Sequence, residues 1–324
     1  PPEVGGSLGA GQPGRWLMPA TGEAAEHSAV DVLELVDRCT FPPPGSELVC
    51  AVSGGADSLA LLVLAVAAGC EVTAVHVDHG LREGSAREAD VVADAARRYG
   101  AKFRAERVDV CPGPNLEARA RDARRSVLPP GAATGHTMDD QAETVLLNVL
   151  RGAGLDGLSA MRPGPEHPLL SVRRAETAAI CSGEGLVPVQ DPTNGQARFA
   201  RNRVRHELLP RCCDIAGRDV VPVLARQAEL LSGEADLLDE LASAIDPSDA
   251  RALAGAPRVL ARRATRRWLR HGDHPPDSGA VERVLHVAEG KVRATDVAPG
   301  TRVRRSRGVL STTPIEEVAR NDVR

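Results

Sequence analysis

The sequence predicts an α/β fold in which helices cover both faces of a parallel sheet and a smaller, mainly helical domain follows. Three observations predict it. Short apolar runs alternate with helix-like patterns through the first half of the chain. A glycine-rich turn joins the first apolar run to a helix pattern. Beyond about residue 215 the apolar spacing becomes helical. Alternating strands and helices imply right-handed crossovers and therefore a parallel sheet.

Bulk composition limits the classes of protein to consider. The chain has 324 residues, of which 42% are hydrophobic, enough for a large core and two domains. Its net charge of −4 gives no overall basicity for binding nucleic acid. The seven cysteines form no C-x-x-C pair, which favours neither a zinc site nor a disulfide framework. The longest uncharged apolar stretch, residues 58–70, is too short to span a bilayer. We therefore expect a cytoplasmic protein with no membrane partner.

The first half of the chain divides into regular elements. Residues 1–26 are rich in Pro, Gly, Ala and Glu and predict a disordered extension. A helix is expected over residues 28–39, and another directly after the glycine-rich turn. The expected strands cover residues 48–52, 71–77, 102–108 and 131–134, and the helices between and after them cover residues 85–99, 115–128 and 139–151.

The second half is mainly helical. After a glycine-rich loop over residues 152–158, a last strand is expected over residues 168–172. The expected helices cover residues 174–183, 200–213, 224–245, 258–270 and about 276–287, with a short hairpin over residues 303–312. We place the domain boundaries at residues 26/27 and 214/215, which gives an extension (1–26), an α/β domain (27–214) and a mainly helical domain (215–324).

The glycine-rich turn is a candidate phosphate site. It lies between a strand and a helix, so its backbone N–H groups meet the positive end of a helix dipole. Two glycines let an anion approach the backbone, and two serines add hydroxyl donors. A carboxylate here would repel phosphate unless a cation lay between them, which predicts Mg²⁺ at Asp57. The alternative is a turn that merely joins the two elements. The candidate residues are Ser53, Gly54, Gly55, Ala56, Asp57 and Ser58.

A second candidate is the acidic pair Asp140 and Glu143, which share one face of the expected helix over residues 139–151. Acids in a first helical turn are also ordinary complements of the dipole. Near a nucleotide, such a pair has two further roles: to hold Mg²⁺, or to bind an amine nucleophile and take its proton. The polar segments 53–58, 78–82 and 135–143 all follow strands, and in parallel sheets ligands bind at that edge.

The S-G-G-A-D-S turn resembles the phosphate loop of the PP-loop (N-type) ATP pyrophosphatases, which cleave ATP between its α and β phosphates. Further motifs follow in order up to residue 211: H-V-D-H-G-L-R, G-H-T-M-D-D-Q-A-E-T, R-G-A-G-L-D-G-L, P-L-L, D-P-T-N and R-N-R-V-R-H-E-L-L-P. Together they resemble the tRNA(Ile)-lysidine synthetase family. The glycine turn marks only the superfamily, whereas the H-x-x-D-D-Q-x-E-T and R-N-x-x-R blocks are more specific.

The resemblance implies a PP-loop ATP pyrophosphatase domain, of the adenine nucleotide alpha hydrolase-like fold, and a ligase. ATP would adenylate C2 of the wobble cytidine in the CAU anticodon of tRNA(Ile). Free L-lysine would then displace AMP and form lysidine, with pyrophosphate as the other product. ATP and Mg²⁺ are the implied cofactors, and tRNA(Ile) and lysine the partners. The oligomeric state stays open, and a homodimer is one option.

The resemblance also assigns residues. Asp140 and Glu143 match acidic positions tied to lysine handling and activation, and Arg201 and Arg205 match arginines near the activated nucleotide; these four are the expected catalytic residues. The expected substrate-binding residues are His79, Arg82, His136 and Asn202. For His136, a structural role at the end of a strand is as good an interpretation. The chain departs from the family at His167, where an arginine often precedes P-L-L.

Two other functions are weighed. A PP-loop tRNA thiolase would need cysteines that carry sulfur or a cluster, and the only close pair is Cys212–Cys213. A nucleotide-binding regulator without turnover would bind ATP and release no pyrophosphate.

Residues 258–270 hold six arginines, which form a solvated face on a typical helix. With an RNA substrate, phosphate contact becomes the favoured interpretation.

Overall fold

The structure is a computed structural model that describes residues 31–78, 80, 86–109, 116–189, 199–270, 276–298 and 300–314. The expected N-terminal extension, His79, Arg82 and the turn at 190–194 lie outside the described residues. In the described part of the chain, no helix has the length and apolar character needed to cross a membrane.

A four-stranded parallel sheet forms the first half of the protein, as the sequence predicts. Its order is β3-β2-β1-β4, so the two central strands are those that precede the glycine turn and the 78–82 segment. The last strand is short, and Cys50 and Ala51 of β1 pair with its two residues. The strands are β1 (Glu47–Ala51), β2 (Glu71–Asp78), β3 (Lys102–Arg107) and β4 (Ala133–Thr134).

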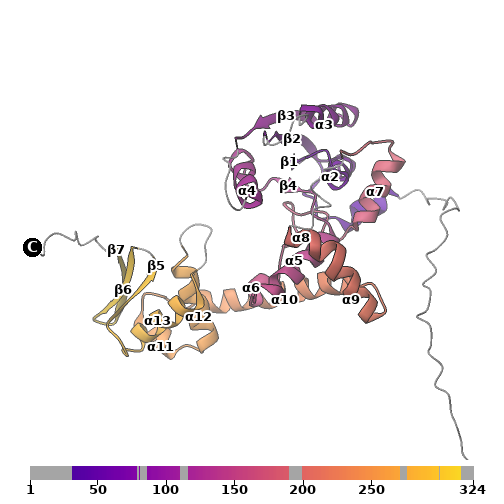
Figure 1. Ribbon diagram of the computed structural model, residues 1–324. Helices are drawn as coiled ribbons and strands as arrows, with labels where there is room; N and C mark the ends of the chain where they lie inside the picture. Colours follow the sequence, from indigo (N-terminus) through magenta and orange to yellow (C-terminus); the bar gives the residue numbers. More distant parts are fainter. Residues whose placement is uncertain are drawn as a thin grey trace, which may run out of the picture.

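Helices lie on both sides of this sheet (Figure 1). Helix α2 follows the glycine turn, and its central residues 58–65 are all buried. It lies between the sheet and α7, and α4 lies on the opposite side of the sheet. The helices of this part are α1 (Val32–Arg38), α2 (Ala56–Ala67), α3 (Ala86–Arg98), α4 (Leu116–Val127), α5 (Met138–Leu150), α6 (Leu155–Leu158) and α7 (Arg174–Gly183).

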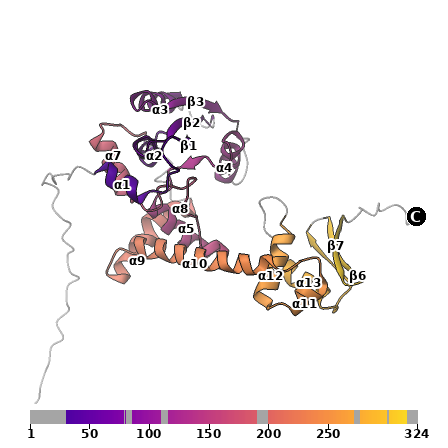
Figure 2. The ribbon, with the colours of Figure 1, turned by 180° about the vertical axis from the view of Figure 1, so that it is seen from behind.

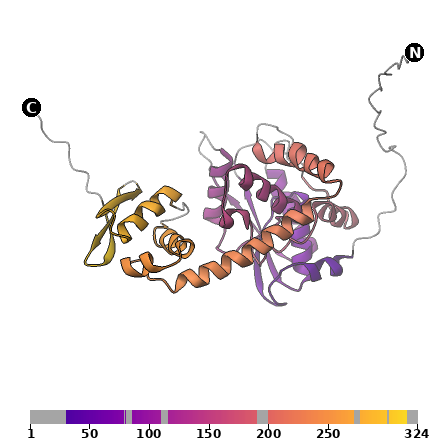
Figure 3. The same cartoon turned by 90° about the horizontal axis from the view of Figure 1, so that it is seen from below.

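The remainder is helical with a small antiparallel sheet. The expected helix over residues 200–213 is a continuous helical run made of α8 (Ala200–Arg203), a π-helical turn (Val204–Leu208) and α9 (Leu209–Ala216). The long helix α10 (Val221–Ser243) packs on α5 and continues to the C-terminal elements (Figures 2 and 3). Those elements are α11 (Ala250–Gly255), α12 (Arg258–Trp268), α13 (Ser278–Ala288), β5 (Ala294–Ala298), β6 (Thr301–Ser306) and β7 (Val309–Pro314).

Two expected elements differ from the structure. The predicted strand over residues 168–172 is wrong: this segment forms turns, although Leu169 and Val172 are fully buried. Its backbone bonds to distant elements, since the Thr40 N–H donates to the Pro168 carbonyl and the Met138 N–H to the Val172 carbonyl. The predicted loop over 152–158 ends in the single-turn helix α6. The expected hairpin exists as β6 and β7, with β5 added at its edge.

Candidate nucleotide and ligation site

The glycine turn has the geometry of an anion site. Gly54 has φ +85°, a conformation that side chains disfavour, and a Cβ there would lie 3.2 Å from Val189 Cγ2. The Ser58 hydroxyl donates to the Gly55 carbonyl (2.9 Å) and accepts from the Ser53 N–H (3.1 Å). No side chain caps the first turn of α2, which starts one residue after Gly55. Its N–H groups are thus placed to bind a phosphate oxygen.

The second polar segment lies directly against this turn. A Cβ on Gly135 would come within 2.7 Å of the Asp57 carbonyl oxygen and 3.0 Å of the Ser58 nitrogen. Only glycine therefore lets the connection from β4 to α5 approach the first turn of α2 so closely. Gly135 brings the two sequence motifs together at the carboxyl edge of the sheet, as the sequence predicts.

Helix α5 carries the acidic pair into the interior. Thr137 caps the helix, and its N–H and hydroxyl both donate to Asp140 Oδ2 at 2.9 Å. This leaves Asp140 Oδ1 directed at the arginines described below. Glu143, one turn further along, has no exposed surface. A fully buried carboxylate requires charged partners.

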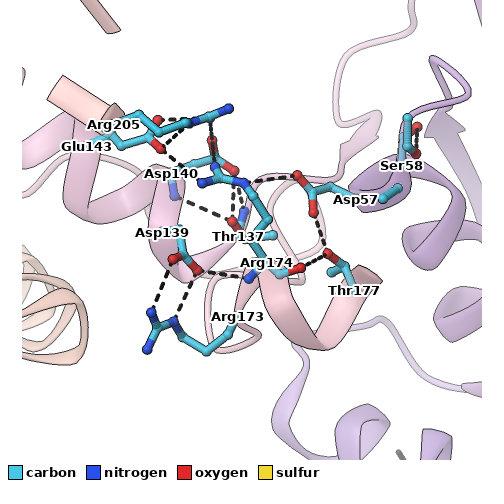
Figure 4. Close-up of polar contacts among 12 residues, drawn as sticks. Asp57, Ser58, Thr137, Asp139, Asp140, Glu143, Arg173, Arg174, Thr177 and Arg205 are labelled. Carbon is cyan, nitrogen blue, oxygen red and sulfur yellow. Dashed lines mark hydrogen bonds and ion pairs between the residues drawn. The ribbon is translucent and has the colours of Figure 1, made fainter. Parts of the chain in front are cut away.

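Three arginines from later segments supply those partners, and Figure 4 labels two of them, Arg174 and Arg205. Arg174 at the start of α7 binds both acids, with its Nη2 2.8 Å from Asp140 Oδ1 and its Nη1 3.1 Å from Glu143 Oε1. Arg201 Nε lies 3.0 Å from Glu143 Oε2, and Arg205 Nε lies 2.6 Å from Glu143 Oε1. The structure thus unites the four expected catalytic residues in one cluster.

Arg174 also connects this cluster to the glycine turn, and the sequence analysis missed it. Its Nε lies 3.6 Å from Asp57 Oδ2, and the Thr177 hydroxyl donates to the other oxygen of Asp57. A signal for it exists in the sequence. Arg173 and Arg174 begin a helix, where positive side chains oppose the helix dipole. Such a local conflict is expected at functional sites.

The electrostatics of the two aspartates differ. Burial raises the pKa of Asp57 above its usual value, and the Thr177 hydroxyl and Arg174 only partly oppose this. Burial would also raise the pKa of Asp140, but Arg174, the Thr137 N–H and Arg201 outweigh it and hold that pKa below its usual value. Asp140 is therefore a stable anion suited to binding a cation, and a weak base.

The other expected site residues are less central. His136 Nδ1 lies 2.7 Å from the Thr134 hydroxyl, which His167 Nδ1 also approaches at 2.8 Å. The two rings meet edge to face at 5.2 Å. His167, the departure from the family pattern, is thus part of a polar cluster at the end of β4. Asn202 is half-buried on α8 beside Arg201.

The donor set at Asp57 fits a divalent cation held mainly by phosphates. Mg²⁺ in nucleotide sites takes one or two carboxylates and completes its shell with phosphate oxygens and water. Asp57 offers one carboxylate in the first turn of α2, and a guanidinium already lies against it. Among the described residues, no group of three or more His, Cys, Asp or Glu side chains is placed to hold a metal by itself.

Comparisons with known proteins agree with this geometry. A family model described as a PP-loop domain matches residues 25–212. A tRNA(Ile)-lysidine synthase from Nocardia farcinica is 42% identical over 273 residues, covering 78% of this chain and 84% of the relative. One from Cutibacterium acnes is 39% identical over 282 residues, covering 80% and 88%. The solved structure of the U34-tRNA thiolase NcsA from Methanococcus maripaludis has a TM-score of 0.50 at 16% identity and covers 62% of this chain and 79% of that chain, a likeness of fold.

Proposed function

Because the chain belongs to the tRNA(Ile)-lysidine synthase family of PP-loop proteins, we propose that it joins lysine to C2 of the wobble cytidine in tRNA(Ile) with a CAU anticodon. ATP is consumed to AMP and pyrophosphate. One structural observation supports this most strongly. The glycine turn and the buried acidic pair, 83 residues apart between Asp57 and Asp140, meet at one edge of the sheet.

In the first half-reaction, the C2 carbonyl oxygen of the cytidine attacks the α-phosphorus of ATP and pyrophosphate leaves. The glycine turn, residues 53–58, binds the phosphates through its backbone N–H groups and the Ser53 hydroxyl, which is on an exposed residue. Asp57 would hold Mg²⁺ when the ion is bound with the nucleotide. The ion would neutralise charge that develops on pyrophosphate as the bond breaks.

In the second half-reaction, the lysine amine attacks C2 and AMP leaves. Lysine approaches as an ammonium ion, so it first needs an anionic site. Asp140 and Glu143 supply that site because both are buried carboxylates at the edge where the nucleotide binds. Arg201 and Arg205 hold these carboxylates in place and face the activated nucleotide. One of these two carboxylates takes the proton from the ammonium ion.

We also propose a separate role for each of the two domains. The catalytic domain spans residues 27–214, and residues 215–324 contact the tRNA. Arg258, Arg262, Arg263 and Arg266 of α12 already pair with acids of α6, α10 and α13. RNA contact from this helix therefore falls mainly to its exposed Arg267 and to Arg270 just beyond it. We keep the cytoplasm as the compartment, where tRNA is modified, and a homodimer as an option for assembly.

One assay tests the proposal against its alternatives. The protein is incubated with Mg²⁺, ATP, labelled lysine and a CAU-anticodon tRNA(Ile) transcript. Label in RNA and pyrophosphate are followed together, with a transcript whose wobble base is uridine as the matched control. We expect label in the first RNA only, with pyrophosphate released. Sulfur incorporation from a supplied donor, without lysine, would establish a thiolase. ATP binding without pyrophosphate release would establish a regulator.

A further inference from the structure

The guanidinium of Arg174 contacts three carboxylates on two helices. It donates hydrogen bonds from Nη2 to Asp140 at 2.8 Å and from Nη1 to Glu143 at 3.1 Å. Its third nitrogen, Nε, lies 3.6 Å from Asp57, which is an ion pair too long for a hydrogen bond. The side chain is therefore anchored to α5 and only loosely attached to α2.

The backbone of Arg174 is fixed more firmly than its side chain. Its N–H donates to Asp139 Oδ2 at 2.8 Å, and its carbonyl oxygen lies 2.8 Å from the Thr177 hydroxyl oxygen. The same hydroxyl contacts Asp57 (Figure 4). The start of α7 thus has a fixed position between α2 and α5. A change of partner at Arg174 requires only rotation of its side chain.

Charge balance shows why such a change matters. Three acids face three arginines in the cluster: Asp57, Asp140 and Glu143 against Arg174, Arg201 and Arg205. A lysine ammonium needs carboxylate oxygens that guanidinium groups now occupy. Adding it to a neutral, largely buried cluster leaves one positive charge in excess, which is costly at low dielectric. One guanidinium must withdraw. Of the three, Arg174 is the one that also reaches toward the glycine turn.

We infer that Arg174 is a positioning residue that couples nucleotide binding to lysine binding. This inference rests on the proposed function. A triphosphate with one divalent ion keeps a net negative charge, which attracts the guanidinium toward the glycine turn. That movement removes one guanidinium partner from Asp140 Oδ1 and one from Glu143 Oε1, while Arg201 and Arg205 stay in place. Each of the two oxygens can then accept a hydrogen bond from the lysine ammonium. Coupling between binding sites is reciprocal, so lysine strengthens nucleotide binding by the same factor.

The test is lysine binding to the full chain, measured by titration calorimetry with and without Mg²⁺ and an ATP analogue that has a methylene group between its α and β phosphorus atoms. In the wild type, the nucleotide should tighten lysine binding by about 5- to 150-fold, the usual range for coupled sites. In Arg174→Met, lysine should bind more tightly than it binds to the nucleotide-free wild type, because Asp140 Oδ1 and Glu143 Oε1 have each lost one guanidinium partner. The coupling factor should fall to about one.

Arg173→Met is the matched control. Arg173 precedes Arg174 at the start of α7, but its guanidinium pairs with Asp139 and Asp219. Its loss should lower stability while the coupling factor stays at the wild-type value. A merely structural role of Arg174 would instead weaken lysine binding equally with and without nucleotide.

Several results would overturn the inference. They are a wild-type factor near one, a wild-type factor retained in Arg174→Met, or loss of lysine binding in both states of a folded variant. If Arg174→Met does not fold, Arg174→Lys replaces it. A single ammonium cannot contact α2 and α5 at the same time, so the coupling factor of Arg174→Lys should also fall. A coupling factor equal to the wild-type value in Arg174→Lys would refute the inference. Lysine incorporation by the wild type is assayed separately. If the wild type incorporates lysine but shows no coupling, this inference fails while the proposed function stands.

Discussion

Gly135→Ala tests the close approach that joins the two halves of the site. A Cβ at this position would lie 2.7 Å from the carbonyl oxygen of Asp57, 2.9 Å from its carbonyl carbon and 3.0 Å from the Ser58 nitrogen. All three are backbone atoms of the first turn of α2, so no side-chain rotation relieves the contact. Reaching an ordinary separation of about 3.4 Å requires the connection from β4 to α5 to move by about 0.7 Å.

That displacement has two measurable consequences. Overpacking of this kind costs about 1–3 kcal/mol of unfolding free energy. It also moves Thr137 and Asp140 away from the glycine turn, since both lie in the segment that begins α5 shortly after Gly135. A misplacement of about 1 Å near reacting groups can cost about 100-fold in rate. We therefore expect kcat/KM for lysine incorporation to fall by about 10- to 100-fold.

Urea unfolding and the lysine incorporation assay measure both effects. The matched control is Gly233→Ala in the middle of α10, where an added Cβ meets nothing within 4 Å. Alanine there should raise the unfolding free energy by about 0.5–1 kcal/mol and leave incorporation unchanged. A Gly135→Ala variant as stable and active as the wild type would refute the steric argument.

Three further substitutions follow from charges. In Asp57→Asn, pyrophosphate release should fall by about 100-fold or more. Its unfolding free energy at neutral pH should not fall, because a raised carboxyl pKa means that the folded state penalises the anion at any pH above that pKa. Asp140→Asn should have the opposite effect on stability. Because the pKa of Asp140 is lower in the folded state, its anion stabilises the fold at any pH above its unfolded pKa, and this stability is lost as the pH falls through the folded pKa. The difference in unfolding free energy between wild type and variant, measured in urea, should therefore shrink below about pH 4. Arg263→Ala removes ion pairs with Asp239 and Asp156, which are partly exposed, and should lower the unfolding free energy by about 1 kcal/mol without changing ATP affinity in titration calorimetry.

Local patterns explain why much of the fold could be predicted. The buried strand before Ser53 and the helix after it, which is apolar from Leu59 onward, predict a strand, a glycine turn and a helix in that order. The pairing of Asp140 and Glu143 on one helix face follows from their spacing. By contrast, residues 168–172 have the apolar content of a buried strand, but Leu169 and Val172 fill the core from turns. Apolar content predicts burial, and it does not distinguish a strand from a buried turn.

Partners that come together only in three dimensions could not be predicted. The arginines of α12 give a strong sequence pattern, but the acids that pair with them lie on other helices. Arg258 pairs with Glu282 and Glu289, and Arg263 with Asp156, more than a hundred residues earlier. A helical pattern shows which face a charge occupies and not what that face meets. Arg174 was missed for the same reason, since its three acids lie on α2 and α5.

The cost of the charged cluster is itself an argument for its function. A largely buried set of carboxylates and guanidiniums loses solvation that mutual attraction only partly restores, and apolar residues of similar size often stabilise a protein more. The fold could have closed this edge with leucine and valine, as it does around α2. Balanced charges lie there instead. Among the described residues, this is the edge where the glycine turn, the close approach of Gly135 to α2 and the start of α7 meet. A cluster that is neutral when empty can accept a cation only if one of its own cations moves. Arg174, held to α5 by hydrogen bonds and to α2 by a longer ion pair, meets that requirement.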